Sequence, residues 1–204
     1  DWVGGRYPSE DPTPKDPVAL RLALAQPEGL AVYLARPCQF LAQQQPSVCV
    51  PSVWTRDRFA PVMVNALNQA IGVLKAQYGA KDLALVGYSG GARLALELAA
   101  ERQDVIQIIT VAGNLDPQAW VAAFGMRPLT AGTDDAVLIQ QLQDVPQWHW
   151  VGGQDVVVPK QLTEQFVGRF KNDERIRVMV RNNNAHVCCW AEQWPGIWRE
   201  ASGL

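Results

Sequence analysis

Short apolar runs alternate with longer amphipathic stretches along this 204-residue chain, and this alternation restricts the folds open to it. Each run is a few residues long and rich in Val, Ile, Leu or aromatic side chains, as expected of strands buried on both faces. Strands are predicted at residues 30–35, 83–87, 105–112, 147–152 and 176–180. Strands that alternate with helices join into a parallel sheet. The predicted class is therefore α/β, a mostly parallel sheet with helices on both faces.

The stretches between these runs carry apolar residues three and four positions apart, the pattern of a helix with one buried face. Helices are predicted over residues 17–25, 57–78, 91–102 and 160–170. Asp16 is predicted to cap the first of them, with Pro17 at its first position. Residues 116–145 are longer than an ordinary crossover and predict a cap or insertion within a single domain of residues 1–204. Residues 1–16 are rich in Pro, Gly and Asp, which indicates an irregular lead-in.

Charge and hydropathy argue against two kinds of partner. The 18 basic and 20 acidic side chains leave a net charge of -2, which offers no general attraction to nucleic acid or anionic lipid. No apolar run reaches the roughly 18 residues that span a bilayer. We therefore expect neither a nucleic-acid partner nor a membrane span in this chain, and the oligomeric state stays open.

Four cysteines and two histidines are too few, and too irregularly spaced, for a zinc site, so no metal and no cofactor is expected. Cys38 and Cys49 flank a loop of polar and turn-forming residues at 43–47. A disulfide and two buried thiols are both open there. Cys188 and Cys189 are neighbours, and because direct pairing strains the linkage, at least one is predicted to pack as a small apolar group.

Tryptophans recur at four-residue spacing near the end of the chain, at positions 190, 194 and 198. We expect them to pack in the core and not to bind a ligand. Pro195 and Gly196 are predicted to interrupt a continuous helix there.

A glycine-flanked serine, Gly87-Tyr88-Ser89-Gly90-Gly91, joins the second apolar run to a predicted helix. In this setting the serine lies on a sharp turn, and glycines are expected on both sides because larger side chains would collide. The hydroxyl of Ser89 would project above the sheet. The N–H of Gly90, at the start of the helix, could then bind a developing oxyanion. The alternative is a tight structural turn with an idle serine.

A serine hydroxyl needs a base to become a nucleophile, and the chain has two histidines. His186 follows the last predicted strand through a polar turn, at the strand end where catalytic groups of α/β sheets gather. His149 lies inside a strand between two tryptophans and is predicted to pack within the sheet. His186 is therefore the candidate base.

A carboxylate must orient that base. Asp155 lies just past the strand at 147–152 and is the candidate acid, while Asp116, after the strand at 105–112, is its rival. The predicted catalytic residues are Ser89, Asp155 and His186, with Gly90 in the oxyanion hole.

These three turns, in the chain order Ser89, Asp155, His186, resemble the α/β-hydrolase superfamily over residues 17–190. More narrowly, the chain resembles exported bacterial hydrolase-like proteins, often lipoproteins, through Asp11-Pro12-Thr13-Pro14, Ala35-Arg36-Pro37-Cys38-Gln39, Trp54 with Arg58-Phe59, and Ala112-Gly113-Asn114-Leu115-Asp116. The narrower resemblance implies a periplasmic or envelope location and a disulfide between Cys38 and Cys49. It indicates no particular substrate.

The function expected from these residues is that of a serine hydrolase acting on a carboxylic ester or related small acyl substrate through an acyl-enzyme at Ser89. A non-catalytic binding or scaffold protein with the same fold is an alternative. So is a peptidase, because peptidases and esterases of this fold use the same three residues.

One part of such a site is not visible in the sequence. In this fold a second oxyanion N–H comes from the loop after a strand that lies two crossovers before the nucleophile. Residues 1–16 contain no apolar run that could form this strand. We therefore expect the natural polypeptide to extend before Asp1 and to supply the strand and the donor. Otherwise the donor comes from residues 1–5, near Gly4 or Gly5.

Overall fold

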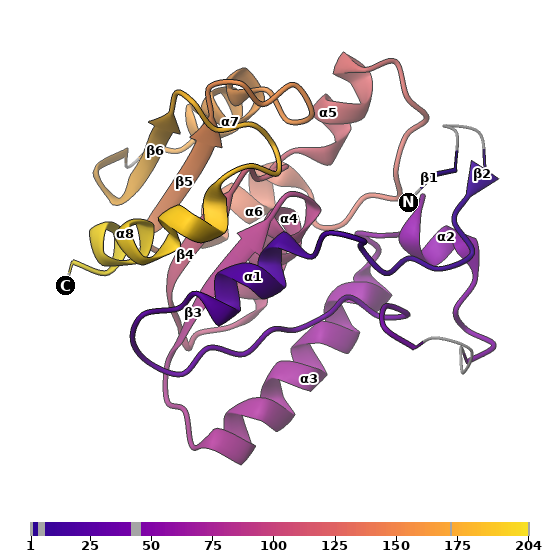
Figure 1. Cartoon of the computed structure of the whole chain (residues 1–204), viewed down its shortest axis with the longest axis horizontal. Coiled ribbons are helices and arrows are strands. Elements are labelled where there is room, and N and C mark those ends of the chain that lie inside the picture. The colour runs from indigo at the N-terminus through magenta and orange to yellow at the C-terminus, as the bar shows by residue number, and fades with distance from the viewer. Residues whose placement is uncertain (1, 4–6, 42–45, 172, 204) are drawn as a thin grey trace.

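Four parallel strands form the central sheet in the order β3-β4-β5-β6 (Figure 1). The computed structural model describes residues 2–3, 7–41, 46–171 and 173–203. The strands of the sheet are β3 (Leu83–Tyr88), β4 (Val105–Val111), β5 (Gln147–Gly152) and β6 (Ile176–Arg181). A separate antiparallel pair joins β1 (Trp2–Val3) to β2 (Tyr7–Pro8). The α/β class is confirmed.

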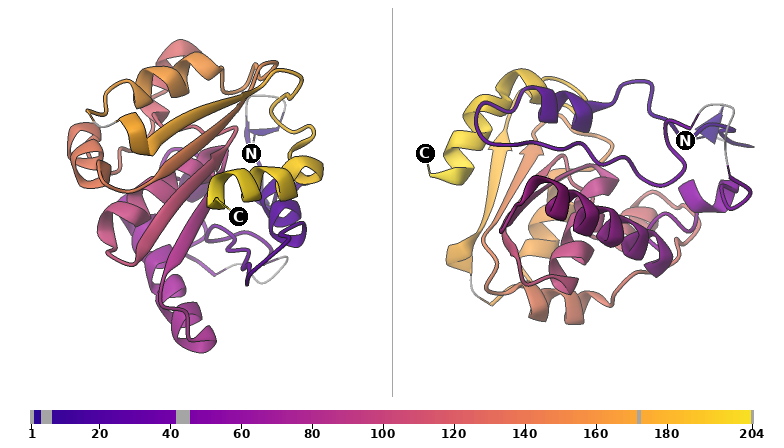
Figure 2. Two further views of the ribbon diagram at one scale, coloured as in Figure 1. Left: turned by 90° about the vertical axis from the view of Figure 1, so that its left-hand side faces the viewer. Right: turned by 90° about the horizontal axis from the view of Figure 1, so that it is seen from below.

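Helices cover both faces of this sheet (Figure 2). One face carries α1 (Val18–Leu24) and α8 (Trp190–Ser202). The other carries α4 (Gly90–Glu101), α6 (Asp135–Leu142) and α7 (Lys160–Val167), with α3 (Pro61–Tyr78) packed against α4. The remaining helices are α2 (Pro51–Trp54), α5 (Pro117–Ala123) and the 3-10 helix η1 (Asp173–Arg175). No helix in the described parts of the chain is long and apolar enough to cross a membrane.

The core divides into clusters on the two faces because side chains alternate along each strand. Along β4, Ile108 packs with Leu96 and Leu138 on the face of α4 and α6. Its neighbour Ile109 points to the other face and packs with Trp150 and Trp194. From Ile108 to Val111, both faces of β4 are therefore buried.

The first predicted strand does not form. Residues 30–35 follow α1 and run between α1 and α3 (Figure 1), but no backbone hydrogen bond joins them to another described segment. Leu30 is 66% exposed and Val32 is 45% exposed. A strand needs a neighbour to satisfy its backbone groups, and no described strand lies beside this segment. The other four predicted strands are confirmed: β5 has the predicted bounds, and each of the other three differs by one residue at its carboxyl end.

Helix ends also differ from prediction. The predicted cap of α1 is wrong by one residue: Pro17, and not Asp16, is the N-cap. The carboxylate of Asp16 instead pairs with Arg21 at 3.0 Å. Helix α3 begins at Pro61, four residues later than predicted, because proline at a first helical position loses no hydrogen bond. Helix α7 ends three residues earlier than predicted, at Val167.

The predicted interruption of the last helix is wrong, since α8 continues through Pro195. Proline lacks an N–H, so its place in the second turn costs the helix only the bond to the carbonyl of Ala191. Trp190 and Trp194 are buried beneath this helix. Their predicted packing role is confirmed.

The region at 116–145 contains two helices and the irregular chain between them. Asp134 caps α6 by accepting hydrogen bonds from the N–H groups of Ala136 and Val137, at 2.9 and 3.4 Å. Leu138 and Leu142 of α6 are buried in the core, so this helix completes the crossover from β4 to β5. That residues 116–145 cap the substrate stays a prediction.

Both cysteine pairs are joined. Cys38 and Cys49 form a disulfide with their Cα atoms 5.6 Å apart, so the bridge is present and the alternative of two free thiols is excluded. Residues 43–45 of the loop it closes lie outside the described residues. Cys188 and Cys189 are also paired, so the prediction that one of them packs as a small apolar group is wrong. Adjacent thiols stay within reach of each other whatever the rest of the fold does.

Replacing both Cys38 and Cys49 by alanine should lower the free energy of unfolding by about 3 kcal/mol, because the bridge closes a short loop and restricts the unfolded chain. Urea unfolding of the double variant and the parent, both oxidised, measures this difference. An unchanged midpoint and slope would show that the bridge contributes nothing to stability.

Candidate active site

Ser89 lies on a strained turn between β3 and α4, with φ at 50° and ψ at -124°. Gly87 makes the turn sterically feasible, because a Cβ added there would lie 2.5 Å from the Cα of Ala92 and 2.7 Å from the carbonyl oxygen of Gly91. The predicted need for glycine is therefore confirmed at Gly87. It is wrong at Gly91, where an added Cβ would meet nothing within 4 Å.

The start of α4 faces the same point as the serine hydroxyl. Gly90 is the first residue of the helix and Ser89 is its N-cap, but the Ser89 side chain makes no capping hydrogen bond. The hydroxyl therefore stays available to another partner. The first N–H groups of a helix have no partner within it and form the positive end of its dipole. This arrangement suits the predicted role of Gly90 as an oxyanion donor.

The structure brings the three predicted catalytic residues together in one hydrogen-bonded chain. Nε2 of His186 lies 3.0 Å from Oγ of Ser89, and Nδ1 of His186 lies 2.8 Å from Oδ2 of Asp155. Ser89 follows β3, Asp155 follows β5 and His186 follows β6. The carboxyl ends of parallel strands meet at one edge of a sheet, which is why residues so distant in sequence become neighbours here.

The carboxylate of Asp155 is held from both sides. Its Oδ1 accepts hydrogen bonds from the N–H groups of Val157 and Val158, both at 2.8 Å, which leaves Oδ2 for His186. The Asp155 side chain is fully buried and that of His186 is 13% exposed. Fixing both oxygens gives the carboxylate a single orientation toward the imidazole.

Two aromatic residues that sequence reasoning did not assign to the site hold the backbone of His186. The His186 carbonyl accepts hydrogen bonds from the hydroxyl of Tyr88 at 3.1 Å and from Nε1 of Trp190 at 3.0 Å. Burial, followed by the nearby charge of Asp155, raises the pKa of Tyr88, so its hydroxyl stays protonated as a donor. The position of Tyr88 next to Ser89 in the motif could have indicated that its side chain lies at the site.

Two glycines let the turn of His186 approach the turn of Asp155. A Cβ on Gly152 would lie 2.4 Å from the carbonyl oxygen of Asn184, and one on Gly153 would lie 2.7 Å from that of Asn182. The N–H of Gln154 donates to the Asn184 carbonyl at 3.0 Å. The sequence Gly152-Gly153 after a strand could have indicated this close contact.

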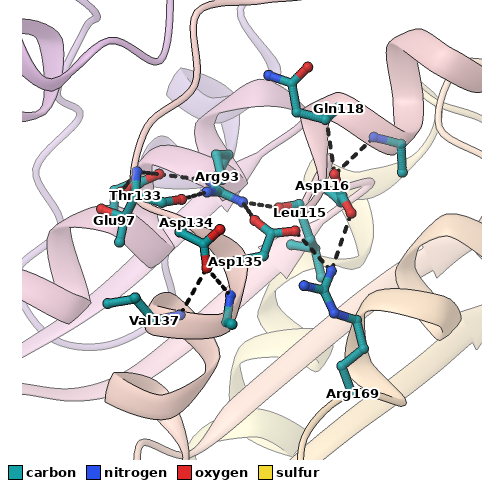
Figure 3. Close-up of polar contacts among 12 residues, drawn as sticks. Arg93, Glu97, Leu115, Asp116, Gln118, Thr133, Asp134, Asp135, Val137 and Arg169 are labelled. Atoms are coloured by element: carbon teal, nitrogen blue, oxygen red, sulfur yellow. Dashed lines mark hydrogen bonds and ion pairs between the residues drawn. The ribbon is translucent and has the colours of Figure 1, made fainter.

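Asp116, the rival acid, has a different set of partners (Figure 3). It caps α5, and its Oδ1 accepts hydrogen bonds from the N–H groups of Gln118 and Ala119 at 3.1 and 2.9 Å. Its Oδ2 lies 3.4 Å from the guanidinium of Arg169. The structure therefore brings Asp155, and not Asp116, to His186.

The other histidine lies inside the sheet. His149 is fully buried on β5, and its Nδ1 shares a hydrogen bond of 2.8 Å with Oγ1 of Thr110 on the neighbouring β4. Burial lowers the pKa of His149 to about 3. The predicted packing role of this residue is confirmed.

A buried ion network fixes the chain that leaves β4 (Figure 3). Arg93 on α4 is 4% exposed, and its guanidinium contacts Glu97 at 2.8 Å, Asp135 at 2.6 Å, and the carbonyls of Leu115 and Thr133 at 3.1 and 2.6 Å. Buried charges are tolerable only when paired and fully hydrogen-bonded, as here. The network ties the helix that starts at the nucleophile to the region after β4.

Ser89 and Gly90 open onto a groove of about 760 Å³. Arg36 and Arg58 line it as well. Burial, and after it the charge of Arg36, lower the pKa of Arg58 to about 10, so the Arg58 guanidinium stays charged at neutral pH. Among the described residues, no group of three or more His, Cys, Asp and Glu side chains could hold a metal ion.

The fold is that of the α/β-hydrolase superfamily of serine hydrolases. The profile of one family, described as serine hydrolase (FSH1), matches residues 42–191. Because this match covers most of the chain, the chain belongs to that family. Comparison with curated protein sequences gave no significant match.

Solved structures share the fold. An α/β serine hydrolase homologue from Coxiella burnetii is 22% identical with a TM-score of 0.58, and the match covers 93% of this chain and 76% of that one. The esterase domain of a Rhodothermus marinus protein is 19% identical with a TM-score of 0.53 over 69% of both chains. The Pyrococcus furiosus esterase PF2001 is 15% identical with a TM-score of 0.51 over 72% of this chain. The present chain spans 61% of the length of that esterase.

Two glycines of the nucleophile turn should respond differently to the same substitution. Gly87→Ala places a methyl group against the backbone of α4, so we expect several kcal/mol of destabilisation or loss of folding. Gly91→Ala enters open space within a helix and should leave stability unchanged or raise it by up to about 1 kcal/mol. Thermal unfolding of both variants measures this. Equal losses of stability in the two variants would show that a side chain at Gly87 does not collide with the backbone of α4.

His149 should make stability depend on pH. The unfolded chain binds a proton at this histidine below about pH 6.5, whereas the folded protein does not until about pH 3, so stability falls as pH falls through this window. Between pH 7 and pH 5 this residue should account for about 2 kcal/mol of lost stability. Urea unfolding at both pH values should show a loss smaller by that amount in His149→Gln. An identical loss of stability in His149→Gln would show that protonation of His149 does not cause it.

Proposed function

We propose that the protein hydrolyses a carboxylic ester, or a related small acyl compound, through an acyl-enzyme at Ser89. The observation that carries this proposal is the unbroken chain from Oγ of Ser89 through the imidazole of His186 to the buried carboxylate of Asp155. Membership of the serine hydrolase family and the fold shared with esterases support it.

The first half of the reaction forms the acyl-enzyme. Oγ of Ser89 attacks the carbonyl carbon of the ester, and the hydroxyl proton passes to Nε2 of His186. The carbonyl electron pair moves onto its oxygen, which becomes an oxyanion. When this intermediate collapses, the bond to the alcohol oxygen breaks, and His186 returns its proton to the departing alcohol. Asp155 accepts the Nδ1 hydrogen bond throughout and stabilises the imidazolium.

The second half repeats these steps with water as the nucleophile. Water attacks the acyl carbon while His186 takes one of its protons, and the new oxyanion collapses with rupture of the bond to Oγ of Ser89. The proton on His186 then returns to Oγ. The products are the alcohol and the carboxylic acid, and the site is restored. In both halves the oxyanion lies near the start of α4, where the N–H of Gly90 stabilises it.

Exposed apolar side chains follow Asp155 and His186 in the sequence. Val156 and Val157 follow Asp155 and are 79% and 43% exposed, and Val187 follows His186 and is 44% exposed. Nε1 of Trp120 on α5 donates to the carbonyl of Val157 at 2.7 Å, which connects α5 to the turn that carries Asp155. These surfaces favour an ester whose acyl or alcohol part is uncharged and apolar. A panel of acyl chain lengths on a common leaving group tests this preference.

Ser89→Ala should abolish turnover and labelling by a fluorophosphonate probe, with a fall in kcat on the order of 10⁶-fold. The variant should fold normally, because Ser89 lies in a turn and its hydroxyl is hydrogen-bonded to the His186 side chain, not to the core. Ser202→Ala, at the far end of α8, is the control and should keep full labelling. Labelling of Ser89→Ala at the parent's level would disprove the assignment of Ser89 as the nucleophile. Absence of labelling in the parent would leave a binding or scaffold protein.

The two candidate acids provide a matched pair of variants. Asp155→Asn should lower kcat by about 10⁴-fold, because the amide no longer holds the productive imidazole tautomer. Asp116→Asn should change kcat little, since asparagine caps a helix as well as aspartate does. Steady-state hydrolysis of one p-nitrophenyl ester by both variants shows which aspartate orients His186. A larger loss for Asp116→Asn would reverse the assignment.

A bacterial periplasmic or envelope location is a further part of this proposal. It is supported by the disulfide of Cys38 with Cys49, since such bridges persist in oxidising compartments. Cell fractionation followed by non-reducing peptide mapping tests it. Free thiols at both positions in protein from the native cells would contradict it.

A further inference from the structure

Two arginines lie beside the start of α4. Nη1 of Arg36 lies 3.9 Å from where a Cβ on Gly90 would be, and the ring of Phe59 lies 3.4 Å from the same point. Arg58 precedes Phe59 in the chain, and both arginines line the groove onto which Ser89 opens. Arg36 and Arg58 therefore belong to the part of the groove at the proposed nucleophile.

The two arginines are placed where a positive charge is unfavourable. Burial, and after it the charge of Arg36, lower the pKa of Arg58, and burial lowers the pKa of Arg36 as well. Both causes oppose the charged form, so this arrangement does not stabilise the fold by itself. Charged groups perturbed in this way within a cleft are typical of functional sites. An anion bound between the two guanidinium groups would offset the unfavourable charge.

Arg58 has no carboxylate partner in the part of the chain that the structure describes. Its Nε donates to the carbonyl of Thr55 at 2.6 Å. The adjacent acid, Asp57, pairs instead with Arg56 at 3.0 Å and accepts a hydrogen bond from Thr130. A guanidinium has five N–H donors, so one hydrogen bond to a carbonyl leaves most of them for a ligand.

Three carboxylates of the described residues also line this groove. Asp16 pairs with an arginine of α1 at 3.0 Å, and Glu28 lies 3.7 Å from an arginine of α8. Asp82 comes just before the first residue of β3, whereas Ser89 comes just after the last, a separation of about 20 Å along an extended strand. The acidic side chains of the groove therefore have other partners or lie far from the nucleophile.

Gln39 fixes the turn that carries Arg36. The backbone N–H of Arg36 donates to Oε1 of Gln39, and the N–H of Gln39 donates to the Arg36 carbonyl, both at 3.2 Å. The Gln39 side chain is buried, and its Nε2 donates to the carbonyl of Pro12 at 3.1 Å. The backbone of Arg36 is thus held in place from both of its polar groups.

The disulfide of Cys38 with Cys49 links this turn to the segment of Arg58. Cys38 lies in the same turn as Arg36, and Cys49 lies two residues before α2. The C-cap of α2 is Thr55, whose carbonyl accepts the hydrogen bond from Arg58. A covalent bridge therefore connects the two segments that carry the arginines. Such preorganisation lowers the entropy that is lost when a ligand binds.

We propose that Arg36 and Arg58 together bind an anionic group of the substrate, either a carboxylate or a phosphate. This inference deepens the proposed function and rests on it. A planar guanidinium matches both anions through paired hydrogen bonds. The exposed valines that follow Asp155 and His186 are left for the uncharged part of the ester. The substrate class is then an amphiphilic ester, apolar in one part and anionic in the other.

Paired esters test this preference in the parent protein. p-Nitrophenyl hexanoate and mono-p-nitrophenyl adipate share the leaving group and chain length, and a carboxylate replaces the terminal methyl group in the second. Butyl hexanoate and the hexanoyl ester of 3-hydroxypropyl phosphate place a phosphate on the alcohol side instead. In one pair, kcat/KM should be at least roughly 10-fold higher for the charged ester, and that pair identifies the anion. Charged esters that are no better than the neutral ones in both pairs would overturn the proposal.

Variants locate the preference at the two arginines. Arg58→Gln and Arg36→Gln should each lower the ratio of kcat/KM, charged over neutral ester, by roughly 10-fold. Arg56→Gln is the matched control, because it removes the same charge from an exposed residue that pairs with Asp57, and the ratio should stay that of the parent. Arg58→Lys keeps the charge and should keep more of the ratio than Arg58→Gln. An equal fall in Arg56→Gln, or equal losses on charged and neutral esters in both arginine variants, would overturn the proposal.

Binding without turnover separates this inference from the proposed function. By isothermal titration calorimetry, Ser89→Ala should bind the charged ester of one pair more tightly than the neutral ester, and adding Arg58→Gln should remove the difference. Such binding, with a parent that hydrolyses none of the four esters and does not react with a fluorophosphonate, would disprove the proposed function and leave the anion site. Turnover by the parent with equal binding of charged and neutral esters to Ser89→Ala would overturn the anion site alone.

Discussion

The close approach of β3 to the start of α4 is the contact on which the site depends. At Gly87 the two backbones are so near that one added carbon atom would overlap Ala92. This proximity forces the turn between them into the positive φ of Ser89, where a side chain other than glycine is strained. The strain keeps the hydroxyl in front of His186 and places the first N–H groups of the helix beside it. The proposed nucleophile and oxyanion donor are therefore fixed by one backbone constraint.

The rest of the sheet is arranged so that this turn has partners. Because β3, β5 and β6 run in parallel, their carboxyl ends share an edge, and the turns after them supply Ser89, Asp155 and His186. Close backbone contact recurs at Gly152 and Gly153, which let the turn before His186 lie directly on the turn of Asp155. Hydrogen bonds from Tyr88 and Trp190 to the His186 carbonyl then hold the imidazole in place.

The two sides of the nucleophile are supported differently. Toward β4, α4 is bound to the following region through Arg93, whose buried charge is matched by Glu97 and Asp135. Away from β4, no strand in the described part of the chain pairs with β3, and residues 30–35 run past β3 without pairing to it. An extended apolar segment becomes a strand only when a neighbour satisfies its backbone groups.

The sequence by itself determined the α/β class, four of the five predicted strands and the three residues that meet at the site. Strand composition, helical spacing and the turn Gly87-Tyr88-Ser89-Gly90-Gly91 are local properties, and each is sufficient to predict a local structure. Only the tertiary structure decided that residues 30–35 stay unpaired, that α8 continues through Pro195, and that Asp155 and not Asp116 contacts His186. Those outcomes depend on which segments become neighbours in space, and no local pattern records the distance between two turns separated by a crossover helix.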